Sequence, residues 1–287
     1  MADIKITGVM RASQYSPNNI GNDAAIFNAV AEQLRKRDCE VSVCTEDQFL
    51  NRASPAGVIL NMCRKPESIE RLIDLEERGR LAINSGKGIA NCSRERMTHL
   101  LHKHDIPMPE SLVVSTAHDV RPLLEEKEMG ACWVKRGDQH AVQKEDVVYC
   151  KDCEEAQEAV RGFQARGIKK TVICRHLEGD LVKFYGVQGE KFFHWFYPAD
   201  EGHSKYGHEQ INGRSHGYEF DPDSLHSLCQ QASEALGVMI YGGDCIIDSD
   251  GIPRIIDFND WPSFSPCRAQ AAPAIARAVI RAIQQQP

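Results

Sequence analysis

Two short stretches near the C-terminus decide the fold: residues 241–248, YGGDCIID, and residues 255–264, IIDFNDWPSF, with a turn between them. Both combine apolar β-branched residues with a few acidic ones, which predicts the two strands of a hairpin. Residues two apart on a strand share a face, so Asp257 and Asn259 point the same way, and Asp244 on the partner strand can face them. The neighbouring isoleucines place these polar groups at the edge of a core.

These three side chains offer two carboxylates and an amide. Mg²⁺ prefers a few hard oxygen ligands and completes its shell with water and phosphate oxygens. The pattern therefore predicts a magnesium site formed by Asp244, Asp257 and Asn259. The alternative is an ordinary hairpin whose acidic side chains are solvated.

A second candidate residue ends the apolar strand Cys132-Trp133-Val134. Lys135 would carry its charge into the core there unless it meets an anion. The loop 136–141, RGDQHA, follows directly. This position predicts an anion-binding lysine.

The chain divides into three parts. Strand and helix patterns alternate over residues 1–90, which predicts a small parallel sheet. The connector Ile106-Pro107-Met108-Pro109 lies inside a central lobe predicted over residues 91–170, and residues 171–287 form a C-terminal lobe with the candidate metal site. We therefore expect an α/β domain followed by α+β lobes.

With these residues in place, the chain resembles the ATP-grasp superfamily over nearly its whole length. The last strands of that superfamily carry an acidic residue and then Asp or Glu, any residue, and Asn as magnesium ligands, which match Asp244, Asp257 and Asn259. The resemblance implies an ATP-grasp fold with an N-terminal pre-ATP-grasp domain. It also implies an enzyme that uses ATP and Mg²⁺ on a small-molecule acceptor.

The resemblance also implies roles for residues outside the hairpin. Lys135 matches the lysine on the α- and β-phosphates, and Arg94 falls where a basic residue near a helix start reaches phosphate. The hinge strand that meets adenine through its backbone matches the segment with Cys174, His176 and Leu177, and Glu178 or Asp180 could then reach ribose. Lys183 is similar to the basic residue turned toward the transferred phosphoryl group. The loop after Lys135 departs from the family, which usually has more glycine there.

Residues 198–220 form a long stretch rich in glycine, histidine and charge, without periodicity. A loop of this length is more often functional than inert, so we expect a lid over the site. Its hydrogen-bond donors suit an anionic acceptor, and they are His203, Lys205, His208, Asn212, Arg214 and His216. Together with Lys183, Arg214 is a candidate catalytic residue.

Three functions remain open at this point. Most ATP-grasp enzymes activate a carboxylate as an acylphosphate and join it to an amine, which favours a carboxylate–amine ligase. Asp257 in place of Glu also resembles the inositol phosphate kinases of the same fold, whose acceptor is a hydroxyl. A nucleotide-binding regulatory module would require loss of the metal position or of Lys135, and both are present.

Composition excludes several classes of partner. The formal net charge is −7 and basic residues are scattered, which argues against nucleic acid. The sequence has neither an apolar leader nor a stretch of about 18 apolar residues, so we expect a cytoplasmic protein without a membrane partner. The 11 cysteines are an odd number, which favours free thiols, although Cys150 and Cys153 have zinc-ligand spacing. A homo-oligomer is compatible with the sequence.

Overall fold

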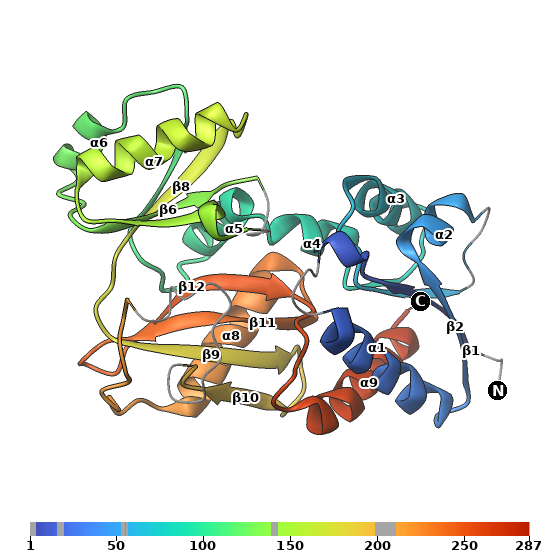
Figure 1. The fold of residues 1–287 in the computed structure, drawn as a ribbon. Coiled ribbons are helices and arrows are strands. Elements are labelled where there is room, and N and C mark those ends of the chain that lie inside the picture. The colour runs from blue at the N-terminus through green and yellow to red at the C-terminus, as the bar shows by residue number, and fades with distance from the viewer. Residues whose placement is uncertain are drawn as a thin grey trace.

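The computed structural model describes residues 4–15, 20–52, 55, 57–138, 143–198 and 211–286. Its strands are arranged in four-stranded sheets, with one sheet in each of the three predicted parts (Figure 1). One sheet is parallel and the other two are antiparallel. The expected combination of an α/β domain with α+β lobes is confirmed.

The N-terminal sheet is parallel, with the strand order β2-β1-β3-β4. Its strands are β1 (Ile4–Met10), β2 (Cys39–Thr45), β3 (Val58–Asn61) and β4 (Ala82–Ile83). The connecting elements are η1 (Ser13–Tyr15), α1 (Ile20–Arg35), α2 (Glu46–Asn51), α3 (Pro66–Glu77) and α4 (Gly86–Asn91). Separate apolar clusters form on its two faces, so its strands are largely buried.

The central sheet is antiparallel, with the order β5-β8-β6-β7. Its strands are β5 (Ser111–Ser115), β6 (Cys132–Arg136), β7 (Val147–Cys150) and β8 (Lys170–Arg175). The helical elements of this part are α5 (Arg94–Lys103), α6 (Arg121–Glu126), η2 (Lys144–Asp146) and α7 (Cys153–Ala165). Cys132 and Val134 of β6 join the core under α6 and α7, so the intervening Trp133 and Lys135 face the other side.

The C-terminal sheet has the order β10-β9-β11-β12, and all its neighbours are antiparallel. Its strands are β9 (Asp180–Val187), β10 (Phe193–Phe196), β11 (Ile240–Ile247) and β12 (Pro253–Asp260). Helix α8 (Pro222–Leu236) packs on one face, where Leu225 and Cys229 meet Val182 and Phe184. The hairpin predicted from residues 241–264 is thus β11 and β12.

The sheets divide the chain differently from the predicted boundaries at two places. β8 pairs with β5 and β6, so the central sheet extends to Arg175, whereas we expected the C-terminal lobe to begin at residue 171. Helix α9 (Arg268–Gln284) lies beside α1 (Figure 1), and Ala274 and Ile275 share a core with Phe27. Both differences come from long-range pairing, which local periodicity does not report.

The same core joins the N-terminal domain to the C-terminal sheet. Ile240 and Trp261 belong to the cluster around Phe27. The buried side chain of Asn84 also donates to the carbonyl of Ile240 and accepts from its N–H, both at 2.8 Å. These two parts therefore form one packed unit. Among the described residues, no helix is both long and apolar enough to span a bilayer.

Candidate active site

Asp244, Asp257 and Asn259 lie on one face of the β11–β12 hairpin. Asp244 is directly opposite Asp257, and Asn259 follows two residues later. The intervening Phe258 is fully buried on the other face, in the core under α8. The structure thus brings together the three side chains that the sequence assigned to a metal.

A β-bulge interrupts this hairpin beside the acidic pair. Asp244 pairs with Asp257 but Cys245 pairs with Ile255, so Ile256 is an extra residue on β12. Bulges turn a strand and redirect its groups, and they recur next to active sites. Here the carbonyl of Ile256 accepts a hydrogen bond from Nζ of Lys135 at 3.0 Å. The bulge therefore links the hairpin to the central lobe.

Each of the two carboxylates lies against a basic side chain from another element. Nζ of Lys183 on β9 lies 2.7 Å from Oδ1 of Asp244, and Nη2 of Arg94 lies 3.5 Å from Oδ2 of Asp257. Both pairs are largely shielded from solvent, which strengthens their attraction. Lys183 and Arg94 therefore lie beside the candidate metal ligands. The sequence had predicted only contacts with phosphate for these two residues.

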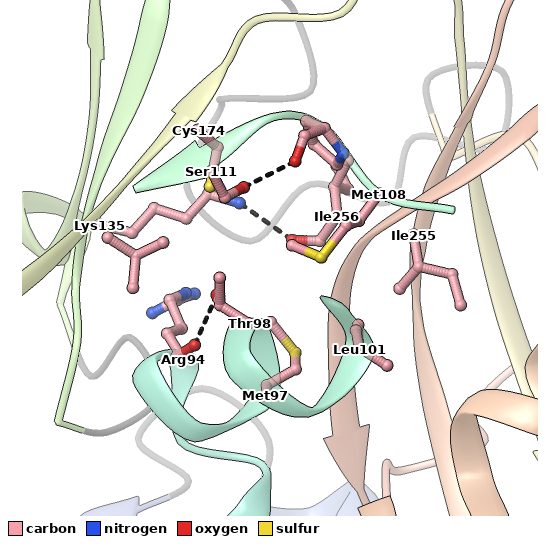
Figure 2. Close-up of a pocket in the computed structure, with 12 residues that line it drawn as sticks. Arg94, Met97, Thr98, Leu101, Met108, Ser111, Lys135, Cys174, Ile255 and Ile256 are labelled. Carbon is pink, nitrogen blue, oxygen red and sulfur yellow. Dashed lines mark hydrogen bonds between the residues drawn. The ribbon is translucent and has the colours of Figure 1, made fainter. Parts of the chain in front are cut away.

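The pocket beside this hairpin lies between α5, the central sheet and β12 (Figure 2). Its polar lining includes Arg94 at the start of α5 and Lys135 on β6, which are only 4% and 8% exposed. Its apolar lining includes Met97, Leu101, Met108, Val172, Cys174 and Ile255. A pocket that combines an apolar wall with two buried cations suits a ligand with a flat apolar part and an anionic part.

Arg94 has hydrogen-bonding capacity left over. Its Nε and Nη1 are buried and have no hydrogen-bond partner among the described residues. Buried guanidinium donors usually have partners, because an unpaired donor loses its hydration without compensation. A phosphate oxygen is the kind of acceptor that would satisfy them. The start of helix α5, where Arg94 lies, adds partial positive charge.

The predicted hinge residues do not all lie in one place. Cys174 lines the pocket, whereas Glu178 is exposed to solvent. His176 accepts a hydrogen bond from Nε1 of Trp133 at 3.1 Å, and burial lowers the pKa of its imidazole. The carbonyl of Leu177 accepts a hydrogen bond from the side-chain amide of Asn212 at 3.1 Å. Only Cys174 among these four is part of the pocket lining.

Asp180 is held by the backbone of a segment further along the chain. Its buried carboxylate accepts backbone N–H groups of His216 at 2.6 Å, Gly217 at 2.8 Å and Tyr218 at 2.9 Å. Burial alone would raise the pKa of Asp180, but these bonds together lower it. The resemblance implied that Glu178 or Asp180 reaches ribose, and in the structure the carboxylate of Asp180 anchors residues 216–218.

The predicted lid is described only in part. His203, Lys205 and His208 lie outside the described residues, as does most of the first half of the loop. Residues 211–220 contain no helix or strand, and the side chain of Arg214 is exposed. The structure therefore does not bring Arg214 to the pocket lining.

The cysteines are present as free thiols. All 11 are free thiols, as expected, and most are buried. In the described parts of the chain, no group of three or more His, Cys, Asp or Glu side chains is placed to hold a metal. Asp244, Asp257 and Asn259 remain as a set of two carboxylates and an amide, which suits Mg²⁺ with water and phosphate as its other ligands.

Sequence reasoning missed two arginines near the end of β12. Arg11 and Arg64 follow β1 and β3 and contact the backbone of Trp261 and Asp260. The signal that would have identified them is their position directly after parallel strands, since the carboxyl ends of such strands commonly carry functional groups.

The arrangement of the three sheets, with the pocket between the central lobe and the last hairpin, is the ATP-grasp fold. The chain is similar to the D-alanine–D-alanine ligase from Bacillus anthracis complexed with ATP, with a TM-score of 0.69 and 14% identity over 100% of both chains. It is also similar to D-cycloserine synthetase DcsG, with a TM-score of 0.67 and 16% identity over 97% of this chain and 99% of the other.

The ATP-grasp ligase PsnB, complexed with a minimal precursor, has a TM-score of 0.63 and 16% identity over 98% of this chain and 99% of the other. The fold implied by the sequence resemblance is thereby confirmed. No protein-family model and no curated protein sequence matches the chain significantly. At these low identities the likeness extends to the fold, and the activity has to be argued from the residues.

Proposed function

We propose that this protein is an ATP- and Mg²⁺-dependent carboxylate–amine ligase. The observation that carries the proposal is that two buried cations of the pocket both contact the hairpin with the candidate metal ligands. Arg94 lies 3.5 Å from the carboxylate of Asp257, and Lys135 donates to the carbonyl of Ile256. Cations and metal ligands at one place are what binding of a metal-bound triphosphate requires. The structures with a similar fold are ligases or synthetases by name, which supports a ligase over the kinase alternative.

The residues present fit a magnesium ion. Asp244, Asp257 and Asn259 would hold it, and Mg²⁺ would offset the negative charge of the β- and γ-phosphates. Arg94 and Lys135 supply further positive charge from the α5 and β6 sides of the pocket. The flat base would lie along the apolar lining that includes Cys174 and Met108.

The chemistry requires positioning more than covalent help from the protein. A carboxylate oxygen of the acceptor attacks the γ-phosphorus, the bond to ADP breaks, and an acylphosphate forms. An amine then attacks the carbonyl carbon, phosphate leaves, and the amine loses a proton as the amide forms. Lys183 on β9 is paired with Asp244 on β11, and from there its ammonium group would approach the transferred phosphoryl group. Exclusion of water matters because an acylphosphate hydrolyses readily.

Product analysis tests this proposal. The purified protein is incubated with ATP, Mg²⁺ and pools of amino acids, small peptides or inositol phosphates, and both phosphate and new products are measured. A ligase releases free phosphate in step with a new amide. A stable phosphoester without free phosphate would instead identify the kinase alternative, and ATP binding without turnover in any pool would favour a regulatory module.

A further inference from the structure

Two arginines of the N-terminal domain contact the end of β12. Nη2 of Arg11 donates to the carbonyl of Trp261 at 2.8 Å, and Nη2 of Arg64 donates to the carbonyl of Asp260 at 3.2 Å. Arg11 directly follows β1 and Arg64 lies shortly after β3, and these strands are neighbours in the parallel sheet. Both arginines therefore lie at the carboxyl ends of neighbouring parallel strands of the N-terminal sheet.

Both arginines are also paired with buried carboxylates. Nη1 of Arg64 lies 2.7 Å from Oδ1 of Asp260, whose side chain is 1% exposed, and Nη1 of Arg11 lies 3.0 Å from Oδ2 of Asp23. Burial lowers the pKa of Arg11, and the positive charge of Arg64 lowers it further. Burying two neighbouring guanidinium groups carries an unfavourable desolvation free energy. Apolar side chains would join the two domains without this penalty.

The contacted backbone is the continuation of the proposed metal face. Asp260 is the next residue after Asn259, and Trp261 has a φ of +33°, which a non-glycine residue rarely adopts. Such a conformation persists only where the surroundings hold it. The carbonyl contacts from Arg11 and Arg64, together with the hydrogen bond from the N–H of Trp261 to the carbonyl of Ile240 at 2.8 Å, hold it here.

We propose that Arg11 and Arg64 are positioning residues, which fix the backbone from Asn259 to Trp261 and thereby set the place of the Asn259 amide relative to Asp257. This role rests on the proposed function, because it concerns the ligands of the metal. It makes the N-terminal domain part of the machinery that orders the active site. Positioning partners of metal ligands commonly change metal affinity by about 10- to 100-fold when they are altered.

The test compares Arg64→Lys and Arg11→Lys with the wild type. Lysine keeps a positive charge beside the buried carboxylate but carries its N–H donors on one nitrogen, so it lacks the fork whose two nitrogens reach the carboxylate and the carbonyl separately. The matched control is Arg281→Lys, because Arg281 likewise contacts a carboxylate, that of Glu190, and a backbone carbonyl, that of Gln188, which follows β9 and does not belong to β12. The readouts are thermal unfolding, Mn²⁺ affinity measured by electron paramagnetic resonance with a non-hydrolysable ATP analogue, and amide exchange over residues 258–261.

We expect Mn²⁺ affinity to fall about tenfold or more in Arg64→Lys, with faster amide exchange at residues 258–261 and an unfolding temperature close to that of Arg281→Lys. Unchanged Mn²⁺ affinity and exchange, with only a lower unfolding temperature, would mean that the arginines merely join the two domains. If Arg64→Lys fails to fold, the double variant R64Q/D260N removes both charges together and is measured in the same way. Absence of Mn²⁺ binding in the wild type would reject the metal site and the proposed function, whereas unchanged amide exchange in the variants rejects the positioning role by itself.

Discussion

Lys183 and Asp244 face each other across strands β9 and β11, with 2.7 Å between Nζ and Oδ1. A basic side chain thus lies against a carboxylate that we assign to the metal. Binding of a metal-bound triphosphate would have to share or displace this contact, and the freed ammonium group is then close to the phosphates. Metal binding and phosphate binding should therefore depend on each other at this pair.

Substitution of Lys183 by Gln should change metal binding and turnover in opposite directions. Without nucleotide, Asp244 loses a competing cation, so Mn²⁺ affinity should rise roughly threefold, as expected for a partly exposed ion pair. Turnover should fall about tenfold or more, because a charge near the transferred group is lost. Titration with Mn²⁺ and steady-state ATP hydrolysis measure the two effects. A fall in both would show that Lys183 only orients Asp244.

Substitution of Asp257 by Asn should lower ATP turnover by about 10²-fold or more at saturating Mg²⁺, because a ligand that acts in the transition state is weakened. The change is nearly isosteric, so the unfolding temperature should stay close to that of the wild type. The control is Asp250→Asn, which alters an exposed carboxylate in the turn of the same hairpin. Near-normal turnover in Asp257→Asn would remove this residue from the metal site.

Substitution of Lys135 by Ala should weaken ATP binding by about tenfold or more, since a buried charge-assisted contact contributes roughly 1.5–3 kcal/mol. The ligand-free protein should unfold at nearly the same temperature, because among the described residues the Lys135 ammonium group donates one hydrogen bond, to the carbonyl of Ile256. Calorimetric titration with an ATP analogue measures the first effect, and Lys169→Ala, an exposed lysine outside the pocket, is the control. Intact affinity with a large loss of stability would assign Lys135 a structural role.

The anchor formed by Asp180 should make residues 216–218 sensitive to acid. The pKa of Asp180 is lower in the folded protein than in the unfolded chain, so its contribution to stability is fully present above the unfolded value of about 3.9. That contribution is lost as the pH falls through the folded pKa. Asp180→Asn should weaken the anchor already at pH 7, by about 1–3 kcal/mol, because hydrogen bonds to a charged acceptor are lost.

Amide exchange of His216, Gly217 and Tyr218 measures this prediction as a function of pH. In the wild type, protection should decline only in strongly acidic solution, whereas in Asp180→Asn it should be low at every pH. Asp221→Asn is a useful comparison, because Asp221 accepts backbone N–H groups at the start of α8 and not in this segment. Equal protection in the wild type and Asp180→Asn would show that other contacts hold residues 216–218.

Local patterns in the sequence were sufficient to place Asp257 and Asn259 on one strand face and Lys135 near the end of an apolar strand. The side-chain period of a strand is two, so Asp257 and Asn259 had to share a face wherever the strand lay, and a lysine that ends an apolar strand had to lie at a core edge. The same periodicity located the strands of the hairpin, although it did not assign every strand to its sheet. A resemblance carried by these residues then predicted the fold, which the structural comparison confirms.

Only the tertiary structure decided which groups meet across the chain. Examples are the pairing of β8 with the central sheet and the hydrogen bonds of Asp180, Arg11 and Arg64. The hydrogen bond between Asp180 and His216 joins residues 36 positions apart, and that between Arg11 and Trp261 joins residues 250 positions apart. Periodicity reports which face of an element is apolar, but it does not report which element covers that face or where a long side chain ends. Those contacts follow from the packing of whole sheets, so the sequence determined the chemistry available in this protein, and the fold determined which groups act together.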